Sequence, residues 1–180
     1  MWKSRKFAVG VMIVVIAGSI LFGSHRSLSG LRRDVEDIFQ NGVNHDGFSI
    51  AADLEKRDGI ARNMTTIALH YYEADDSTLK AVEDARRELQ NAVTPEEKCR
   101  ADRALADSVS ALYDLLSRTD LTEKDEKYPA RLYDDFKSRG MTIQTNGYHQ
   151  AAAEYNRVLD SFPANVLGKL TGVKPASLYQ

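Results

Sequence analysis

An uncharged apolar run near the N-terminus, Phe7–Phe22, constrains this chain most, because such a run is buried either in a bilayer or in a protein core. At about 1.5 Å per residue, the run falls slightly short of a bilayer core of about 30 Å. Basic side chains on both flanks can extend it by snorkelling, and Trp2 suits the interface between lipid and water. We therefore predict a single membrane-spanning helix within residues 1–26.

The same run also fits a cleavable signal peptide, which is the alternative. No small-x-small cleavage site follows it, and Leu21-Phe22-Gly23 places a bulky aromatic residue where such a site would lie. We therefore expect the segment to be retained as an anchor. The orientation rests on the basic residues, which are closer to the run on its N-terminal side and favour a location of the remaining chain outside the cytoplasm. These residues are Lys3, Arg5 and Lys6 before the run and Arg26, Arg32 and Arg33 after it.

The rest of the chain, residues 27–180, has the three-to-four-residue apolar spacing of amphipathic helices, and no segment alternates as a strand does. Thr94-Pro95-Glu96-Glu97 is the strongest local signal, because Thr and Glu at these positions form a capping box around a helix start. The expected helical segments are Leu28–Ile38, Ile50–Tyr72 with Ser49 as N-cap, Leu79–Leu89, Pro95–Leu116 and a long last helix from Tyr128 to Phe162.

Polar breaks separate these helices, at Asn41–Gly47, Asp75–Ser77 and Asp120–Lys127. Amphipathic helices cannot bury their apolar faces alone, and the breaks let the chain fold back on itself. We predict an all-α fold, in which the N-terminal transmembrane helix precedes an antiparallel bundle of long helices that forms one domain over residues 27–180. A long coiled-coil dimer is the alternative. Gly59, Gly140 and Gly147 are expected to allow close helix packing.

The C-terminal stretch Ala151–Pro163 predicts the end of the last helix, because Pro163 removes a backbone donor and disfavours helical geometry before it. One apolar stripe on this helix is expected to contain Ile143, Ala151, Tyr155, Val158 and Phe162. We therefore predict that Tyr155 and Phe162 are core residues.

Three stretches stand out: Leu54–Met64, then Lys127-Tyr128-Pro129, and finally Thr145-Asn146 with Tyr155-Asn156, Phe162-Pro163 and the apolar tail. In this order they resemble the LemA family of membrane-anchored bacterial proteins. The chain departs from the family pattern at Arg62, Thr145 and Ala152, where relatives often have Pro, Glu and Arg, and it resembles a divergent member. The resemblance implies a helical fold and a retained N-terminal span in a bacterial envelope, without a particular activity.

Charge and cysteine content exclude several functions. The formal net charge is −2, and acids and bases alternate in runs such as Glu83–Glu88, which is typical of a solvated helix face. The sequence has no cluster of Lys and Arg residues of the kind that forms a nucleic-acid-binding surface. Cys99 is the single cysteine, so an intrachain disulfide is excluded, and we expect it in a small or apolar seat on its helix.

No catalytic, cofactor-binding or metal-binding residue is predicted. His70 and Glu73 have the spacing of two ligands on one helical face, but zinc needs three or four converging ligands. His45-Asp46 and His149, which is near Asn146 and Glu154, are read in the same way, as ordinary polar residues. Asn63, Asn146 and Asn156 lie near apolar strips, so we expect them to pair structurally; binding of a ligand is the alternative.

The leading functional hypothesis is a non-enzymatic scaffold or interaction module, anchored in the bacterial envelope by its N-terminal helix. Its expected partners are membrane lipid and an unidentified envelope protein. The alternatives are an enzyme or metal-binding protein that uses His70 and Glu73, and a sensor whose bundle relays a signal across the single span.

Overall fold

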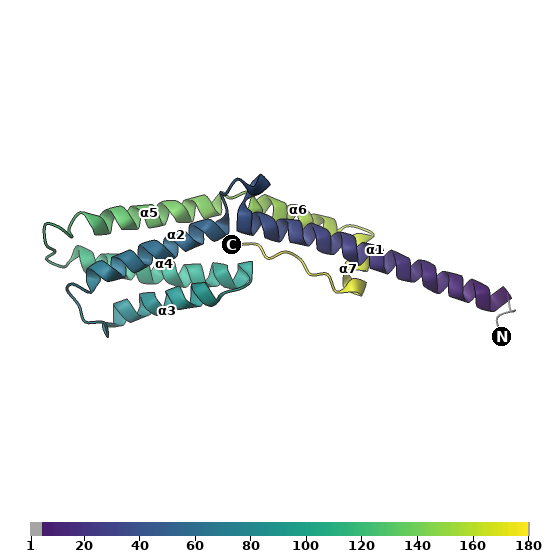
Figure 1. Cartoon of the computed structure of the whole chain (residues 1–180), viewed down its shortest axis with the longest axis horizontal. Helices are drawn as coiled ribbons and strands as arrows, with labels where there is room; N and C mark the ends of the chain where they lie inside the picture. The colour runs from purple at the N-terminus through teal and green to yellow at the C-terminus, as the bar shows by residue number, and fades with distance from the viewer. Residues whose placement is uncertain (1–4, 180) are drawn as a thin grey trace. The chain divides into compact units, whose positions relative to one another are not determined.

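All regular secondary structure in the described residues, 5–179, is helical and none of these residues forms a β-strand, so the predicted all-α class is confirmed. They come from a computed structural model of the chain. Trp2 and Lys3, which we assigned to the membrane interface and its flank, lie outside the described range. The elements shown in Figure 1 are α1 (Arg5–Asn41), the 3₁₀ turn η1 (Val43–His45), α2 (Ile50–Ala68), α3 (Ser77–Asn91), α4 (Pro95–Ser117), α5 (Tyr128–Gln144), α6 (Tyr148–Asp160) and α7 (Ala164–Thr171).

Helix α1 runs without a break from the apolar run through the expected helical segment Leu28–Ile38. Every residue from Arg5 to Ile20 is exposed, and α1 is long and apolar enough to cross a membrane. The helix ends at Asn41 and is followed by Gly42, whose φ of 83° is unfavourable for a residue with a side chain. A Cβ there would also meet Asp46 Oδ1 and lie 3.0 Å from the carbonyl oxygen of Phe48.

The chain divides into two compact units. One contains Met1–Asp37 with Gln150–Ala176, and the other contains Ile38–His149 with Ser177–Gln180. The first unit thus combines most of α1 with most of α6, all of α7 and the segment after α7. Its core includes Leu28 and Val35 of α1 and Tyr155 and Leu159 of α6.

In the second unit, α2 to α5 lie side by side as an antiparallel four-helix bundle (Figure 1), which confirms the predicted bundle. The most extensive contacts are those of α3 with α4 and of α2 with α5. All four helices contribute fully buried core side chains, which include Met64, Val82, Leu105, Val109, Leu112, Leu116 and Ile143. Arg86 of α3 is also buried, and its Nε donates to Asp58 of α2 at 2.9 Å.

Two helix starts follow the local chemistry that predicted them. The Ser49 hydroxyl accepts a hydrogen bond from the Ala52 amide at 3.1 Å. Thr94 accepts from the Glu97 amide, and the Glu97 carboxylate accepts from the Thr94 amide at 3.0 Å. These bonds satisfy backbone donors that a helix start otherwise leaves without partners.

The prediction of one long last helix is wrong. Helix α5 ends at Gln144, and α6 begins at Tyr148. Between them, Asn146 Oδ1 accepts from the Tyr148 amide at 2.9 Å, so the side chain starts a new helix rather than continuing the old one. Asn-Gly pairs favour turns, and here this local preference overrides the apolar periodicity on both sides. Helix α7 after Pro163 was not predicted.

The predicted stripe is therefore right only in part. Tyr155 is buried, with 4% of its surface exposed, but Phe162 is 84% exposed and Val158 is 38% exposed. The buried face of α6 instead contains Tyr148, Ala152, Tyr155 and Leu159. Because α6 starts anew at Tyr148, a register extrapolated from Ile143 does not apply to it.

Two of the glycine predictions have opposite outcomes. A Cβ on Gly140 would lie 2.5 Å from a terminal guanidinium nitrogen of Arg57, so close packing is confirmed at this position. A Cβ on Gly59 would meet nothing within 4 Å, so the same prediction is wrong for Gly59.

Candidate functional site

His70 and Glu73 do not share a helical face. Helix α2 ends at Ala68, short of the expected Tyr72, so His70 lies in the turn that follows. Its Nδ1 lies 3.0 Å from Oδ2 of Asp125, and the Tyr71 hydroxyl donates to the same oxygen at 2.9 Å. Together, the His70 and Tyr71 hydrogen bonds lower the pKa of Asp125. These hydrogen bonds hold the segment between α4 and α5 against the turn that follows α2.

The other histidines lie elsewhere. His45 is exposed in η1, and Nε2 of His149 lies 2.8 Å from the carbonyl oxygen of Ile143, in the last turn of α5. Within residues 5–179, no group of three or more His, Cys, Asp or Glu side chains could hold a metal ion. Within the same range, His70, Glu73, His45 and His149 therefore do not form part of a three-ligand metal site.

The three asparagines differ in their surroundings. Asn156 pairs twice with Ala176 of the tail, donating from Nδ2 to its carbonyl at 2.9 Å and accepting its amide at 2.8 Å. Asn146 donates to the carbonyl oxygen of Phe48 at 3.0 Å while it starts α6. The structural pairing that we expected is confirmed for these two. Asn63 is exposed, so its predicted burial is wrong; it lines a pocket of about 780 Å³ between α2 and α5.

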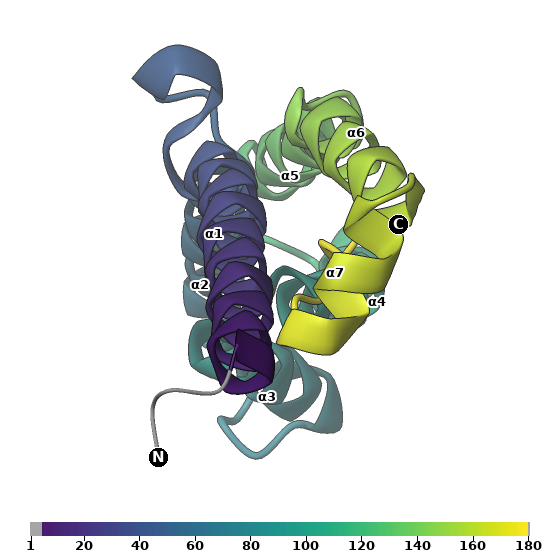
Figure 2. The same cartoon turned by 90° about the vertical axis from the view of Figure 1, so that its right-hand side faces the viewer.

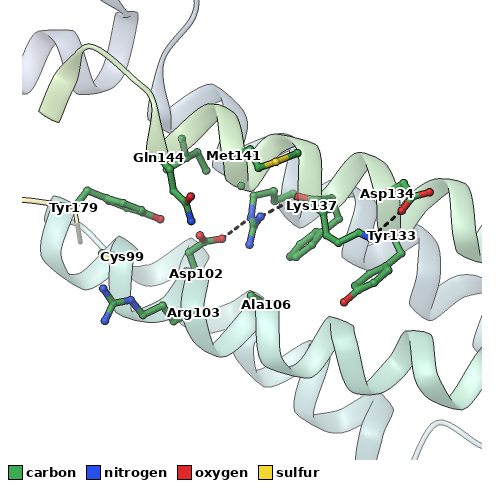
Figure 3. Close-up of a pocket in the computed structure, with 14 residues that line it drawn as sticks. Cys99, Asp102, Arg103, Ala106, Tyr133, Asp134, Lys137, Met141, Gln144 and Tyr179 are labelled. Carbon is green, nitrogen blue, oxygen red and sulfur yellow. Dashed lines mark hydrogen bonds and ion pairs between the residues drawn. The ribbon is translucent and has the colours of Figure 1, made fainter.

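The best-defined pocket of the second unit has a volume of about 810 Å³ and opens between α4 and α5 (Figure 3). Arg57 of α2 and Tyr179 of the C-terminal segment reach into it. Cys99 also lines the pocket, and it is buried on α4, in agreement with the small or apolar helix position that we predicted for it. Sequence reasoning did not assign this site.

A buried charge pair forms one wall of this pocket. Arg57 Nε donates to Asp102 Oδ1 at 2.7 Å, and a terminal nitrogen donates to the Phe136 carbonyl at 2.9 Å. The guanidinium carbon also lies 3.8 Å from the centre of the Phe136 ring. Burial raises the pKa of Asp102, and the nearby Arg57 offsets this only in part. Three different interactions therefore fix Arg57. Its guanidinium group occupies the space that a side chain at position 140 would fill, and Gly140 leaves this space free.

Tyr179 contributes the unusual feature of the pocket. Only 9% of the residue is exposed, and its hydroxyl lies beside the Asp102 carboxylate, whose pKa it helps to lower, without meeting it in good hydrogen-bond geometry. In Figure 3 the ring points toward Gln144 and Asp102. Burial, together with the negative charge of Asp102, raises the pKa of Tyr179, so the hydroxyl keeps its proton. Because this contact is imperfect, a bound polar group could complete the hydrogen bonding of the buried hydroxyl.

One signal in the sequence could have indicated this pocket. Arg57 and Asp102 each occupy a position on the apolar face of their helix, three residues from Leu54 and Leu105 respectively, and buried charges at such positions need partners. No comparable local signal marks Tyr179.

Comparison with known proteins agrees with the sequence motifs. A search of the curated proteins finds no match to this chain. The model of the LemA family matches residues 48–180, which extend from just before α2 to the C-terminus and make up more than half of the chain. This match confirms the family indicated by the motifs at Leu54–Met64, Tyr128-Pro129 and Tyr155-Asn156, and the chain belongs to the LemA family.

Proposed function

We propose that this protein is a membrane-anchored helical bundle that acts as a non-catalytic scaffold or interaction module in the bacterial envelope. The observation that carries the proposal is the uncovered apolar segment of α1. Its residues from Arg5 to Ile20 are all exposed, although most of them are apolar. Water is a poor solvent for such a surface, and a bilayer is a good one.

The arrangement of the histidines supports a non-catalytic role. Each histidine with a described contact bonds to a group that it helps to hold in place, such as the Asp125 carboxylate or the Ile143 carbonyl. General acid–base or nucleophilic catalysis needs such a side chain within reach of a second reacting group. Loss of an enzymatic activity in a folded His70→Ala variant would contradict the proposal.

The membrane anchor can be tested by substituting one residue. Asp at the middle of a spanning helix costs about 2.5–3.5 kcal/mol. Val14→Asp should therefore shift the protein out of the membrane fraction, whereas Val93→Asp should not, because Val93 is equally apolar and exposed but lies outside α1. N-terminal sequencing of the membrane-purified protein tests retention, and a mature chain beginning near Ser24 would contradict it.

We further propose that the part of the chain after α1 lies outside the cytoplasm, because the basic residues before the apolar run are closer to it than those after it. A protease added to spheroplasts should then degrade the bundle of the full-length protein. Degradation only after the membrane is permeabilised would reverse the orientation.

The scaffold role is tested by crosslinking the full-length protein in native membranes. The control is a chain in which residues 1–26 are fused to an unrelated soluble domain. Enrichment of the same envelope proteins by both chains would contradict a role for the bundle.

A second candidate, a ligand-binding sensor, is favoured by the Tyr179 hydroxyl in the pocket between α4 and α5. Native mass spectrometry of the purified protein should then detect a small molecule that is lost in Tyr179→Phe and kept in Tyr113→Phe, which changes a tyrosine that does not line the pocket. Identical spectra from both variants would contradict the sensor.

A further inference from the structure

Three apolar side chains form an unpartnered face on and just before α7. Phe162, Val166 and Leu170 are 84%, 48% and 68% exposed. They are spaced four residues apart, so Val166 and Leu170 lie on one side of α7, and Phe162 leads into that side. We call these three residues the α7 face. Exposed apolar residues that cluster in this way are typical of a contact surface.

The opposite side of α7 packs against α1 directly after the apolar run. A groove of about 350 Å³ has a lining from both helices: Gly23, Ser24, Ser27 and Leu28 of α1, with Pro163, Ala164 and Leu167. A Cβ on Gly168 would lie 3.9 Å from Leu28, so the two helices are close. Helix α7 is thereby placed within about 9 Å, along α1, of the end of the apolar run at Phe22.

The figures show how α7 is oriented within this unit. In Figure 1, α7 lies at the place where α1 leaves its neighbours and continues alone toward the N-terminus. Figure 2 looks along α1 from that end and shows α7 lengthwise, so α7 runs across the α1 axis. A helix that crosses a membrane-spanning helix in this way lies parallel to the bilayer surface.

The charges near α7 fit a lipid surface. Residues 7–33 and 161–175 contain no Asp or Glu. The bases in these stretches are His25, Arg26, Arg32, Arg33, Lys169 and Lys174. Basic residues beside an apolar face are the pattern by which interfacial helices bind anionic lipid.

We propose that the α7 face is a second membrane contact, which inserts into the interface between headgroups and acyl chains of the bilayer that α1 spans. The depth agrees, because the apolar run spans about 24 Å of a core of about 30 Å, so the core extends several ångströms toward Gly23–Leu28. An interfacial helix buries its apolar side about 5–10 Å into that boundary. This inference rests on the proposed membrane anchor.

Tryptophan fluorescence tests the contact in the full-length protein, since Trp2 is its single tryptophan. In a Trp2→Phe background, Leu170→Trp reports on the α7 face, Val14→Trp on the span and Val93→Trp on an exposed site outside both. Each protein is reconstituted in vesicles of phosphatidylethanolamine and phosphatidylglycerol, with bromine on the acyl chains as a quencher. The emission of Leu170→Trp should be blue-shifted relative to Val93→Trp and quenched most by bromines near the headgroup, whereas Val14→Trp should be quenched most by deep bromines.

The possible outcomes separate this inference from the anchor. If Val14→Trp is quenched and Leu170→Trp behaves like Val93→Trp, the α7 face does not contact lipid. A blue shift of Leu170→Trp without quenching would mean that protein covers the face, either a second copy or a partner, and would also overturn the inference. If Val14→Trp is not quenched, the anchor itself is wrong. Lys169→Glu should weaken the quenching of Leu170→Trp, and Arg157→Glu, at an exposed position on α6, should not.

Discussion

Replacement of Asp102 by Ala should strongly destabilise the four-helix bundle. Arg57 and Asp102 have 5% and 11% of their side chains exposed, so Asp102→Ala leaves a buried guanidinium without its carboxylate. Removing one partner of a buried pair costs about 3–5 kcal/mol, mostly because the other charge remains buried. The Phe136 carbonyl still accepts one hydrogen bond from Arg57 but carries no full charge. The loss is a large fraction of a typical stability of about 5–15 kcal/mol.

The measurement is urea and thermal unfolding of a soluble fragment that begins at Ser27, followed by circular dichroism at the helix band. For a domain of this size, 1 kcal/mol shifts Tm by about 2–4 °C, so Asp102→Ala should lower Tm by about 6–20 °C. Arg157→Ala removes an ion pair whose partners are 80% and 62% exposed, and it should change stability by less than about 1 kcal/mol.

The double variant Arg57→Met with Asp102→Leu distinguishes the contribution of the two charges to stability from the contribution of side-chain packing. Apolar residues of similar volume often replace a buried pair at no cost or with a gain in stability. The double variant should therefore be more stable than Asp102→Ala alone. A loss below about 1 kcal/mol for Asp102→Ala would refute the reasoning, since Arg57 would then reach water or another partner. A double variant as unstable as the single one would also refute it.

Further predictions concern helix packing, the core and pH. Gly140→Ala should destabilise the fragment by about 1–3 kcal/mol, because its Cβ collides with a fixed guanidinium, whereas Gly59→Ala should stabilise it by about 0.4–1 kcal/mol in urea unfolding. Tyr155→Ala should cost about 3–5 kcal/mol and Phe162→Ala less than about 0.5 kcal/mol, and equal effects on Tm would contradict the observed register of α6. The backbone hydrogen bonds at the start of α4 lower the pKa of Glu97, so its contribution to stability is complete above the ordinary carboxyl pKa and is lost as pH falls through the lower folded value. Between pH 6 and about 3, the free energy of unfolding should therefore change less with pH in Glu97→Gln than in the unsubstituted fragment.

The features that the sequence predicted depend on neighbouring residues. The capping box at Thr94 uses two residues three positions apart, so its chemistry is visible in a short window. The same holds for Ser49 and for the polar breaks that let α2 to α5 fold into a bundle. The break at Asn146-Gly147 was equally local, but the apolar spacing on both sides concealed it.

The pocket could not be predicted because its parts are distant in the sequence. Arg57 and Asp102 are 45 residues apart, and the Tyr179 ring reaches them from the C-terminal segment. A single sequence shows that Arg57 and Asp102 occupy apolar-face positions, but it does not show which charges meet. The exposure of Phe162 was missed for a related reason, because the turn at Pro163 redirects the chain into α7.

The division of the chain into units has a consequence for synthesis. The second unit is nearly continuous in sequence, but the first joins Met1–Asp37 to Gln150–Ala176 across 112 intervening residues, 38–149. At about 5–20 residues per second, a ribosome needs about 6–22 s to make that stretch. During this time Leu28 and Val35 of α1 cannot form the core of the first unit, because Tyr155 and Leu159 have not yet been synthesised. The bundle can therefore fold first, while the apolar stripe of α1 still lacks the helix that covers it in the complete first unit.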